Sequence, residues 1–444
     1  MIFLEKINQF VWGGPTLILI LTVGIYISIR TGFVQFRLFP KALNTFLHKF
    51  EKRERSSLQA LCTALAATVG TGNLAGVAGA IAIGGPGAVF WMWICAFLGM
   101  ALKFAEATLS VQYRTVNSQN EYVGGPMYMI RNGMPHKWNW LAMVYCFFGV
   151  VAAFGVGNAT QINTLVCSVN VVLNDWGIVD NARNDLILGV FLALLLGAVL
   201  LGGAKRIGSV AETLVPFAAL LYILLALGVL ILRAEQIPGA FCAIISGAFR
   251  PQAVTGGMIG SAFQTLRIGV SRGVFTNEAG MGTAGIAHGS AEVTCPAHQG
   301  LMGIMEVFID TLLICTLTAL VILCSGVTIP YGSDCGIALT TEAFSDVYGN
   351  WVRVLMMIAV CLFAFATVLG WGLYGNRCAQ YLLGERAWKP FAFLQMGAVL
   401  TGALLNTRCV WLLAEFVNGL MAIPALIVLA YLTPSLKKRI QEIC

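Results

Sequence analysis

The chain has 444 residues, of which 58% are hydrophobic and only 11% are charged, whereas a soluble domain carries about 25% charged residues. A water-soluble fold of this length could not bury so much apolar surface, so the composition excludes a soluble globular protein and indicates that lipid is the solvent. The thirteen cysteines are scattered singly, without a CxxC pair, which favours small buried apolar residues over metal ligands.

Apolar segments long enough to cross a bilayer as helices, which takes about 20 residues, recur along the whole chain. They lack the alternation of a barrel strand, and the first is not followed by a signal-peptide cleavage pattern, so we expect it to be retained. No polar stretch between them is long enough for a soluble domain. We predict an all-α polytopic membrane protein with about eleven transmembrane helices, at residues 15–33, 58–83, 87–111, 138–172, 185–203, 209–233, 256–287, 298–326, 350–383, 388–407 and 410–433.

Basic residues gather on one side of this topology. Nineteen of the 27 lysines and arginines lie at the odd-numbered connections and the tail, and the positive-inside rule makes that side cytoplasmic. An odd number of spans then predicts an outside N-terminus and a cytoplasmic C-terminus in a bacterial-type inner membrane. The net charge of +7 therefore reports topology, and we expect no nucleic-acid partner. The nineteen residues are Arg30, Arg37, Lys41, Lys49, Lys52, Arg53, Arg55, Lys103, Arg114, Arg131, Lys137, Lys205, Arg206, Arg377, Arg386, Lys389, Lys437, Lys438 and Arg439.

Two predicted helices contain glycine-rich polar runs in mid-membrane, Ala66–Gly76 in the second span and Gly273–Gly285 in the seventh. Each glycine raises the cost of a helix by about 1 kcal/mol relative to alanine. Backbone groups released in hydrocarbon need partners, so such breaks persist only around a buried site. The two breaks are five spans apart and oppositely oriented, which is typical of an inverted repeat with a binding site at the midplane. The alternative, two glycine-rich packing faces, suits Asn73, Asn277 and Glu278 poorly.

Several strings resemble one transporter family. They are Ala67–Gly79, Gly84–Trp91, Gly124–Tyr128 and Asn277–Gly282, and Thr31–Arg37 fits the first loop of the same family. Over essentially its whole length, the chain resembles the alanine or glycine:cation symporter family, within the leucine-transporter-fold superfamily. The resemblance implies a secondary active transporter, not an enzyme, which takes up alanine or glycine by alternating access with Na+ as the coupling ion and no other cofactor.

The resemblance also implies a domain organisation. A leucine-transporter-like core has ten helices in two inverted halves of five, and one extra N-terminal helix would bring the count to eleven. We expect a single membrane transport domain over residues 1–444. It would comprise the extra helix and a cytoplasmic loop at 1–57, the first repeat at 58–233, the second repeat at 256–433 and a cytoplasmic tail at 434–444.

A zwitterionic amino acid must bring both a carboxylate and an ammonium out of water, and an isolated charge in a low-dielectric site is very costly. We expect backbone amides of the first break to hold the carboxylate, as amides do near a helix terminus. Carbonyl groups released in the second break would accept from the ammonium. The sequence offers few intramembrane charges, so we expect no protein charge to be required. The assigned residues are Gly70, Thr71, Gly72 and Asn73 in the first break and Phe275, Thr276 and Asn277 in the second.

The rest of the pocket follows from the resemblance, by position. Gln161 in the fourth span would face the site, although an interhelical hydrogen bond would also explain it. Thr367 and Trp371 lie four residues apart, on one face of the ninth span. A lipid-facing or core aromatic would also explain Trp371. Phe275 and Trp371 would wall the side-chain end and leave little room beyond a methyl group.

Sodium is a hard cation that prefers oxygen ligands, and unwound carbonyls supply them in this kind of fold. The resemblance implies a site formed by the carbonyls of Ala66 and Val69 in the first break and of Ala364 in the ninth span. The Thr367 hydroxyl would complete it. A second hydroxyl commonly follows the threonine position, and this chain has Val368 there.

Ionisable residues inside the membrane are functional candidates by default. Glu278 is placed at the start of a half-helix, where a carboxylate suits the positive end of the helix dipole. It would either hold the fold or contact the substrate or a gate. Arg267 and Arg272 would pair with Glu278, Glu306 or Asp310, or form a cytoplasmic gate. Their pairing partners remain open from sequence alone.

Lys103 and Glu106 lie near the cytoplasmic end of the third span. They are expected to be interface residues whose charged ends snorkel to water. Neither is assigned to the transport site.

Two other classes of function were weighed. A proton-coupled amino-acid permease of the same fold would need a titrating carboxylate such as Glu278 or Asp310, whereas the Thr367 hydroxyl favours sodium. A polytopic membrane enzyme is disfavoured because the four histidines lie near loops and no HExxH or Gly-x-Ser-x-Gly motif is present. The sequence leaves open the preferred amino acid, the sodium stoichiometry and the oligomeric state.

Overall fold

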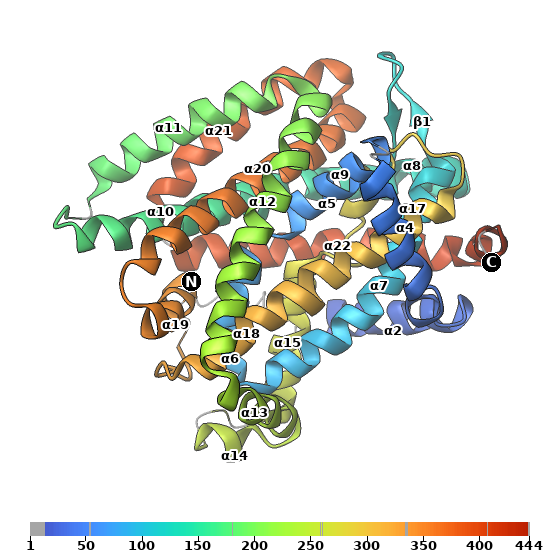
Figure 1. Cartoon of the computed structure of the whole chain (residues 1–444). Helices are drawn as coiled ribbons and strands as arrows, with labels where there is room; N and C mark the ends of the chain where they lie inside the picture. The colour runs from blue at the N-terminus through green and yellow to red at the C-terminus, as the bar shows by residue number, and fades with distance from the viewer. Residues whose placement is uncertain are drawn as a thin grey trace.

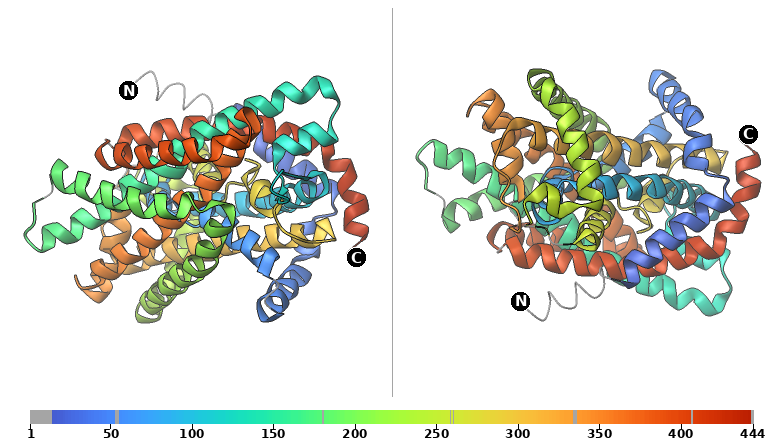
Figure 2. Two further views of the ribbon diagram at one scale, coloured as in Figure 1. Left: turned by 90° about the horizontal axis from the view of Figure 1, so that it is seen from above. Right: turned by 90° about the horizontal axis from the view of Figure 1, so that it is seen from below.

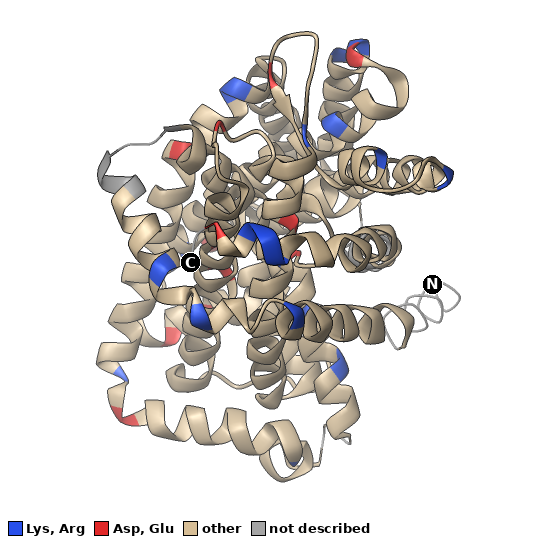
Figure 3. Cartoon of the chain, turned by 90° about the vertical axis from the view of Figure 1, so that its right-hand side faces the viewer, with Lys and Arg blue, Asp and Glu red and all other residues tan. Residues whose placement is uncertain are grey.

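The computed structural model describes residues 14–442 except 53–54, 180, 258, 260, 334–335 and 406, so Arg53 lies outside the described residues. Helices account for nearly all of the described chain, and Figure 1 shows the long helices crossing one another in one bundle. The α10–α11 corner extends to the left of the bundle in both views of Figure 2, and α11 packs along α21. Most of the ribbon in Figure 3 is uncharged, as expected of helices in lipid.

The first part of the chain runs from the N-terminal helix to the sixth predicted span. Its elements are α2 (Pro15–Arg30), α3 (Val34–Arg37), α4 (Phe39–Lys52), α5 (Arg55–Thr68), η1 (Thr71–Asn73), α6 (Ala75–Gly84), α7 (Gly87–Tyr113), the antiparallel strands β1 (Thr115–Val116) and β2 (Tyr122–Val123), α8 (Pro126–Gly133), η2 (His136–Trp138), α9 (Asn139–Phe154), η3 (Gly155–Ala159), α10 (Thr160–Asp175), α11 (Ala182–Leu200) and α12 (Gly203–Leu232).

The second part runs from the sixth connection to the tail. Its elements are η4 (Ala234–Gln236), α13 (Ile237–Phe249), α14 (Pro251–Thr255), α15 (Ala262–Asn277), α16 (Thr283–His288), α17 (Pro296–Val307), η5 (Phe308–Cys315), α18 (Thr316–Ser325), α19 (Gly336–Tyr348), α20 (Val352–Leu383), η6 (Glu385–Ala387), α21 (Trp388–Leu404) and α22 (Thr407–Gln441).

Each predicted span is helical over most of its length, which confirms an all-α polytopic protein. By length and apolarity, seven of the described helices are suited to cross a membrane, or eight if a bent pair counts as one span. The number eleven and the inverted repeat remain predictions. The structure adds helices that the sequence analysis left as connections, such as α4, α13 and α19. A search for apolar runs of about 20 residues does not detect helices of this length.

The two broken helices pack against each other in opposite directions. Gln264, near the start of α15, donates to the carbonyl of Ile83 at the end of α6, at 3.2 Å. Further along, the Thr276 side chain lies beside Gly72 and Gly76, near the start of α6. Helix α7 packs along both α15 and α17 and occupies the centre of the bundle.

Two ends of the bundle are distinguished by contacts between connections. One end joins connections that the sequence analysis placed in the cytoplasm, through the pairs Ser118–Glu385, Glu121–Arg377, Gln112–Arg439 and Ser56–Glu292. The other end joins Asp175 to Arg353 and Arg233 to Asp346. The predicted sidedness is therefore consistent within the fold, because connections expected on one face of the membrane lie together.

A cysteine at each end tests this sidedness. Gln119→Cys, in the exposed β1–β2 turn, is expected to resist an impermeant thiol reagent added outside intact cells, whereas Asn350→Cys, exposed before α20, is expected to react. Labelling of the unsubstituted protein is the control for native cysteines. Both sites should react after the cells are broken. Reaction of Gln119→Cys alone in intact cells would reverse the topology.

Candidate functional site

The first break bends the chain by 56° between α5 and α6. Gly70 is extended, and its amide donates to Asn73 Oδ1 at 2.9 Å. The Asn73 side-chain amide in turn donates to Asp310 Oδ1 at 2.7 Å. A Cβ at Gly70 would overlap the Thr367 hydroxyl on α20, so glycine is required for the two helices to approach here.

The first break releases carbonyl groups from the helix ladder. In a continuous α-helix each carbonyl accepts from the amide four residues further on. The partners of Ala66 and Val69 would be the amides of Gly70 and Asn73, but these donate to Asn73 Oδ1 and to the Gly70 carbonyl instead. The two carbonyls that were predicted to bind sodium are therefore released by the hydrogen bonds of the break itself.

The second break separates α15 from α16 where the Asn-Glu-Ala-Gly-Met-Gly run was predicted to interrupt the helix. Glu278, Gly280 and Gly282 have left-handed φ angles of 54°, 88° and 77°. Such angles are cheap for glycine and uncommon for glutamate. The sequence analysis placed Glu278 at the start of a half-helix. In the structure it follows the end of α15, five residues before α16 begins.

The second break releases carbonyls in the same way. Phe275 and Thr276 would accept from the amides of Ala279 and Gly280 in a continuous helix. The Ala279 amide donates to Asn277 Oδ1 at 3.0 Å, and the Gly280 amide donates to the carboxylate of Glu106 on α7 at 2.7 Å. Side chains thus hold both amides, and the Phe275 and Thr276 carbonyls are left without their helical donors.

Two residues that hold the first break belong to helices with π-helical segments. Gln161 follows η3, and its Oε1 accepts from the Thr71 hydroxyl at 2.8 Å and from the Thr71 amide at 3.2 Å. Asp310 lies within η5. Segments of this kind are frequent at functional sites. Asp310 was weighed from sequence only as a charge, and its bond to Asn73 was missed.

Gly72 faces the second break. A Cβ placed there would lie 3.4 Å from Phe275 Cδ1 and 3.5 Å from Thr276 Cγ2, which is ordinary contact with no spare space. The other three amides predicted to hold a carboxylate, those of Gly70, Thr71 and Asn73, each donate to a group within the protein. Gly72 therefore stands where the two breaks are closest.

Trp371 is fully buried, and its ring packs on Gly157, where any side chain would overlap it. Its indole Nε1 donates to Glu278 Oε1 at 2.7 Å, and the Thr283 hydroxyl donates to the other carboxylate oxygen at 2.7 Å. The indole thus joins α20 to the second break through Glu278. This link was not foreseen from sequence, where Trp371 was assigned only as an aromatic wall.

The predicted site residues fall into three groups in space. The first group meets at the first break and consists of Gly70, Thr71, Gln161 and Thr367, with Ala66, Val69 and Ala364 buried nearby on the same helices. The second group meets between the breaks and consists of Gly72, Phe275 and Thr276. The third group bonds to other parts of the protein: Asn73 to Asp310, Asn277 to the Ala279 amide and Trp371 to Glu278.

A chain of buried polar residues lies beside the second break. Lys103 Nζ pairs with Glu306 Oε1 at 2.7 Å, and His288 Nε2 lies 3.1 Å from Glu306 Oε2. Gln299 Nε2 lies 2.7 Å from His288 Nδ1, and the Ser57 hydroxyl donates to Gln299 Oε1 at 2.6 Å. All five are buried, so this network brings an ion pair, Lys103–Glu306, into the interior beside the second break. His288, treated from sequence as a loop residue, ends α16.

The expectation that Lys103 and Glu106 snorkel to the interface is wrong. Both side chains have zero exposure because α7 is covered by α15, α16 and α17. Glu306 pairs with Lys103 where an arginine, Arg267 or Arg272, was expected. The position of a residue along a predicted span indicates only its depth in the membrane. Which helices cover that residue depends on the tertiary fold.

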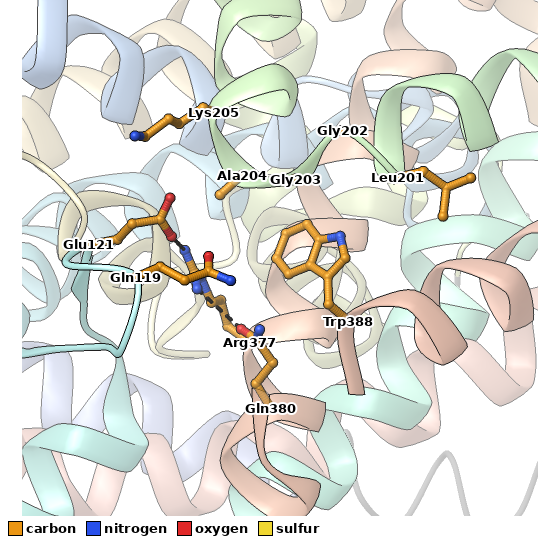
Figure 4. Close-up of a pocket in the computed structure, with 10 residues that line it drawn as sticks. All are labelled: Gln119, Glu121, Leu201, Gly202, Gly203, Ala204, Lys205, Arg377, Gln380 and Trp388. Carbon is orange, nitrogen blue, oxygen red and sulfur yellow. Dashed lines mark hydrogen bonds and ion pairs between the residues drawn. The ribbon is translucent and has the colours of Figure 1, made fainter. Parts of the chain in front are cut away.

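A separate cavity of about 240 Å³ lies at the end that carries the basic connections (Figure 4). Arg377 pairs with Glu121 at 3.0 Å and donates to Gln380 at 3.1 Å, while Lys205 extends from the opposite wall. These contacts hold the β1–β2 turn against α20. None of the predicted substrate or sodium residues lines this cavity.

Comparison with solved structures defines the class of protein. The fold matches that of MhsT, solved in complex with L-phenylalanine, with a TM-score of 0.60 over 85% of this chain and 89% of that chain. Sequence identity is 15%, so this likeness shows the fold alone, which is the leucine-transporter fold. The chain is thus a helical bundle of this fold, with helices apolar enough to cross a membrane.

Comparison of sequences defines the family. The chain belongs to the sodium:alanine symporter family, because the sequence pattern of that family matches residues 1–443. It is 41% identical to the sodium/alanine symporter AgcS of Methanococcus maripaludis, over 97% of this chain and 94% of that protein. It is 38% identical to the amino-acid carrier protein AlsT of Bacillus subtilis, over 96% and 88% of the two chains. The family is one of transporters and not of enzymes.

Proposed function

We propose that this protein takes up alanine or glycine together with sodium, as a secondary active transporter that works by alternating access. Family membership supports amino-acid symport. The observation that carries the finer proposal is the meeting of the two breaks. Gly72 of the first break lies against the Phe275 and Thr276 side chains of the second, while Gly70 lies against Thr367 and Gln161.

The first break supplies donors suited to a carboxylate. The Thr71 hydroxyl and amide both donate to Gln161 Oε1 in this structure. A substrate carboxylate oxygen is a stronger acceptor than an amide oxygen and would take its place. The Gly72 amide would be the next donor, and Gln161, once released, would turn its own amide group to the substrate.

The second break supplies acceptors suited to an ammonium. The carbonyls of Phe275 and Thr276 have lost their helical donors, and the side chains of the same two residues lie against Gly72. Neutral carbonyl dipoles would bind the ammonium without adding a protein charge beside the substrate carboxylate. The donors of one break and the acceptors of the other would together bind an amino acid, whose two charged groups share one carbon atom.

Sodium would bind on the α5 side of the first break. The carbonyls of Ala66 and Val69 have lost their helical donors, and the Thr367 hydroxyl lies against Gly70. Ala364, one turn earlier on α20, would add a third carbonyl. Because the substrate and the ion would share one broken segment, binding of each would stabilise the same arrangement of that segment, which is the basis of coupling.

We also propose that the protein lies in a bacterial inner membrane with its N-terminus outside and its C-terminus in the cytoplasm, and that residues 58–233 and 256–433 form two inverted halves. The clustering of the basic connections at one end and the antiparallel broken helices support this arrangement. The helix α2 would then be the extra N-terminal span.

Uptake of a panel of labelled amino acids into proteoliposomes tests the function and the size of the pocket. We expect glycine and alanine to be taken up with sodium outside, almost no uptake with choline in its place, and rejection of leucine and phenylalanine. Overpacking of about 1–3 kcal/mol corresponds to roughly 5- to 150-fold weaker binding. Phe275→Ala or Trp371→Leu should allow uptake of valine or leucine. Each should also weaken the binding of alanine, because the methyl group of the substrate loses close contacts. Efficient uptake of leucine by the native protein would contradict the aromatic wall.

Thr367→Ala tests the sodium site. Loss of one oxygen ligand should raise the sodium concentration for half-maximal uptake by about tenfold, which corresponds to about 1.4 kcal/mol. The control is Thr433→Ala, because Thr433 makes the same local bond to a carbonyl four residues earlier but lies on α22. Equal sodium dependence in the two variants would remove Thr367 from the site.

A further inference from the structure

The buried groups around the second break are not balanced in charge. One ammonium, that of Lys103, faces three carboxylates, those of Glu106, Glu278 and Glu306, and all four side chains are at most 2% exposed. A buried charge without a partner is very costly, and a group in that position gives up its charge instead. The cluster must therefore contain additional positive charge.

The hydrogen bonds of His288 are satisfied by a neutral ring. One assignment of protons satisfies its whole chain of hydrogen bonds. The Ser57 hydroxyl donates to Gln299 Oε1, so Gln299 presents its amide group to His288 Nδ1, and His288 donates from Nε2 to Glu306. A histidine that accepts at one nitrogen and donates from the other is neutral.

Two of the three carboxylates are saturated with donors. Glu306 accepts from Lys103 at one oxygen and from His288 at the other. Glu278 accepts from the Trp371 indole and from the Thr283 hydroxyl. Hydrogen bonds of this kind favour the ionised form of a carboxyl group.

Glu106 differs from them. Its Oε1 accepts from the Gly280 amide at 2.7 Å, but its Oε2 has no hydrogen-bond partner among the described residues, although the atom is fully buried. Two buried phenols, Tyr145 of α9 and Tyr374 of α20, lie within electrostatic range of Glu106, and in the described part of the chain their hydroxyls also have no partner. No hydroxyl of the described residues therefore donates to Glu106 Oε2, and the carboxyl group has only one of its two oxygens bonded.

We propose that Glu106 binds a proton at Oε2, so that the second break carries a proton site separate from the sodium and substrate sites. A proton needs no cage of ligands, and it converts a buried carboxylate with a bare oxygen into a neutral group, which costs less to bury than a charge. It also removes one of the two excess negative charges. A metal cation at this place is disfavoured because the Gly280 amide points its hydrogen at the same carboxylate.

The site links protonation to the shape of the break. Glu106 is held by Gly280, so a movement of the α15–α16 segment that opens the site to water changes the surroundings of the carboxyl group. The proton then passes to a water molecule, which leaves a carboxylate and a hydronium ion, and it returns when the segment closes. The groups that act on Glu106 are Lys103 on α7, Glu306 on α17, the Gly280 and Gly282 amides at the break, and the phenols Tyr145 and Tyr374. Glu278 and Asp310 act on the same Lys103, and His288 acts on Glu306.

Infrared difference spectroscopy of the purified full-length protein in detergent tests the proton site without any substrate. At neutral pH we expect the carbonyl stretching band of a protonated carboxylic acid. The band should shift when glutamate, but not aspartate, carries carbon-13, and it should be absent in Glu106→Gln. The matched control Glu385→Gln, which removes an exposed carboxylate, should leave the band unchanged.

Three results would overturn the proposal: no such band in the native protein, which would mean that water alone fills the place; a band that shifts only with labelled aspartate; or a band that persists in Glu106→Gln. If Glu106→Gln does not fold, Glu106→Asp provides the second variant. In Glu106→Asp the band should shift when aspartate carries carbon-13 and no longer when glutamate carries it. A band that in Glu106→Asp still shifts with carbon-13 glutamate would contradict the proposal.

Thermal stability provides an independent readout. Glu106→Gln has the shape of the protonated acid and should melt close to the native temperature, whereas Glu306→Gln leaves Lys103 without its carboxylate and should melt well below it. Equal loss of stability in both variants would mean that Glu106 is ionised in the folded protein. Because none of these measurements uses an amino acid or sodium, their outcome is independent of the proposed transport function.

Discussion

The structure depends on one constraint, which is that backbone amides and carbonyls inside a membrane must have partners. An unsatisfied backbone group in hydrocarbon costs several kcal/mol, so a helix can open there only where side chains take over its bonds. Four side chains take over bonds in this way, because each accepts from a backbone amide that no longer donates within its helix: Asn73, Gln161, Asn277 and Glu106. The carbonyl groups that would have accepted from those amides are the groups that we propose bind the substrate and the ion.

The same constraint explains why the interior is more polar than the composition suggests. The side chain that holds the Gly280 amide is the acidic group of Glu106, and it lies next to the Lys103–Glu306 pair. A buried ion pair of this kind adds little net stability, but the loss of one partner costs about 3–5 kcal/mol. The pair therefore fixes α7 against α17 in a defined arrangement, while Glu278 and Trp371 tie α20 to the same region. The second break is thus held from three helices.

Much of this could be predicted from the sequence because it depends on local pattern. Runs of apolar residues located the helices, and the glycines and asparagines of residues 70–73 and 277–282 located both breaks. The partners of those breaks depend on tertiary packing. Asp310 as the acceptor for Asn73, and Glu106 as the acceptor for Gly280, come from helices more than 170 residues away in the chain. No local pattern shows which face of α7 is covered, and for this reason Lys103 and Glu106 were misplaced at the interface.

The central claim is that the first break holds the amino acid, and binding of labelled alanine to purified Gly72→Val tests it most directly. A Cβ at Gly72 already touches Phe275 and Thr276, so the branched side chain would fill the space between the breaks. The matched control is Gly239→Val, since a Cβ at Gly239 meets nothing within 4 Å. With sodium present, the account predicts that Gly72→Val remains monodisperse and loses alanine binding, while Gly239→Val binds like the native protein. Binding of alanine by Gly72→Val with native affinity would contradict the account.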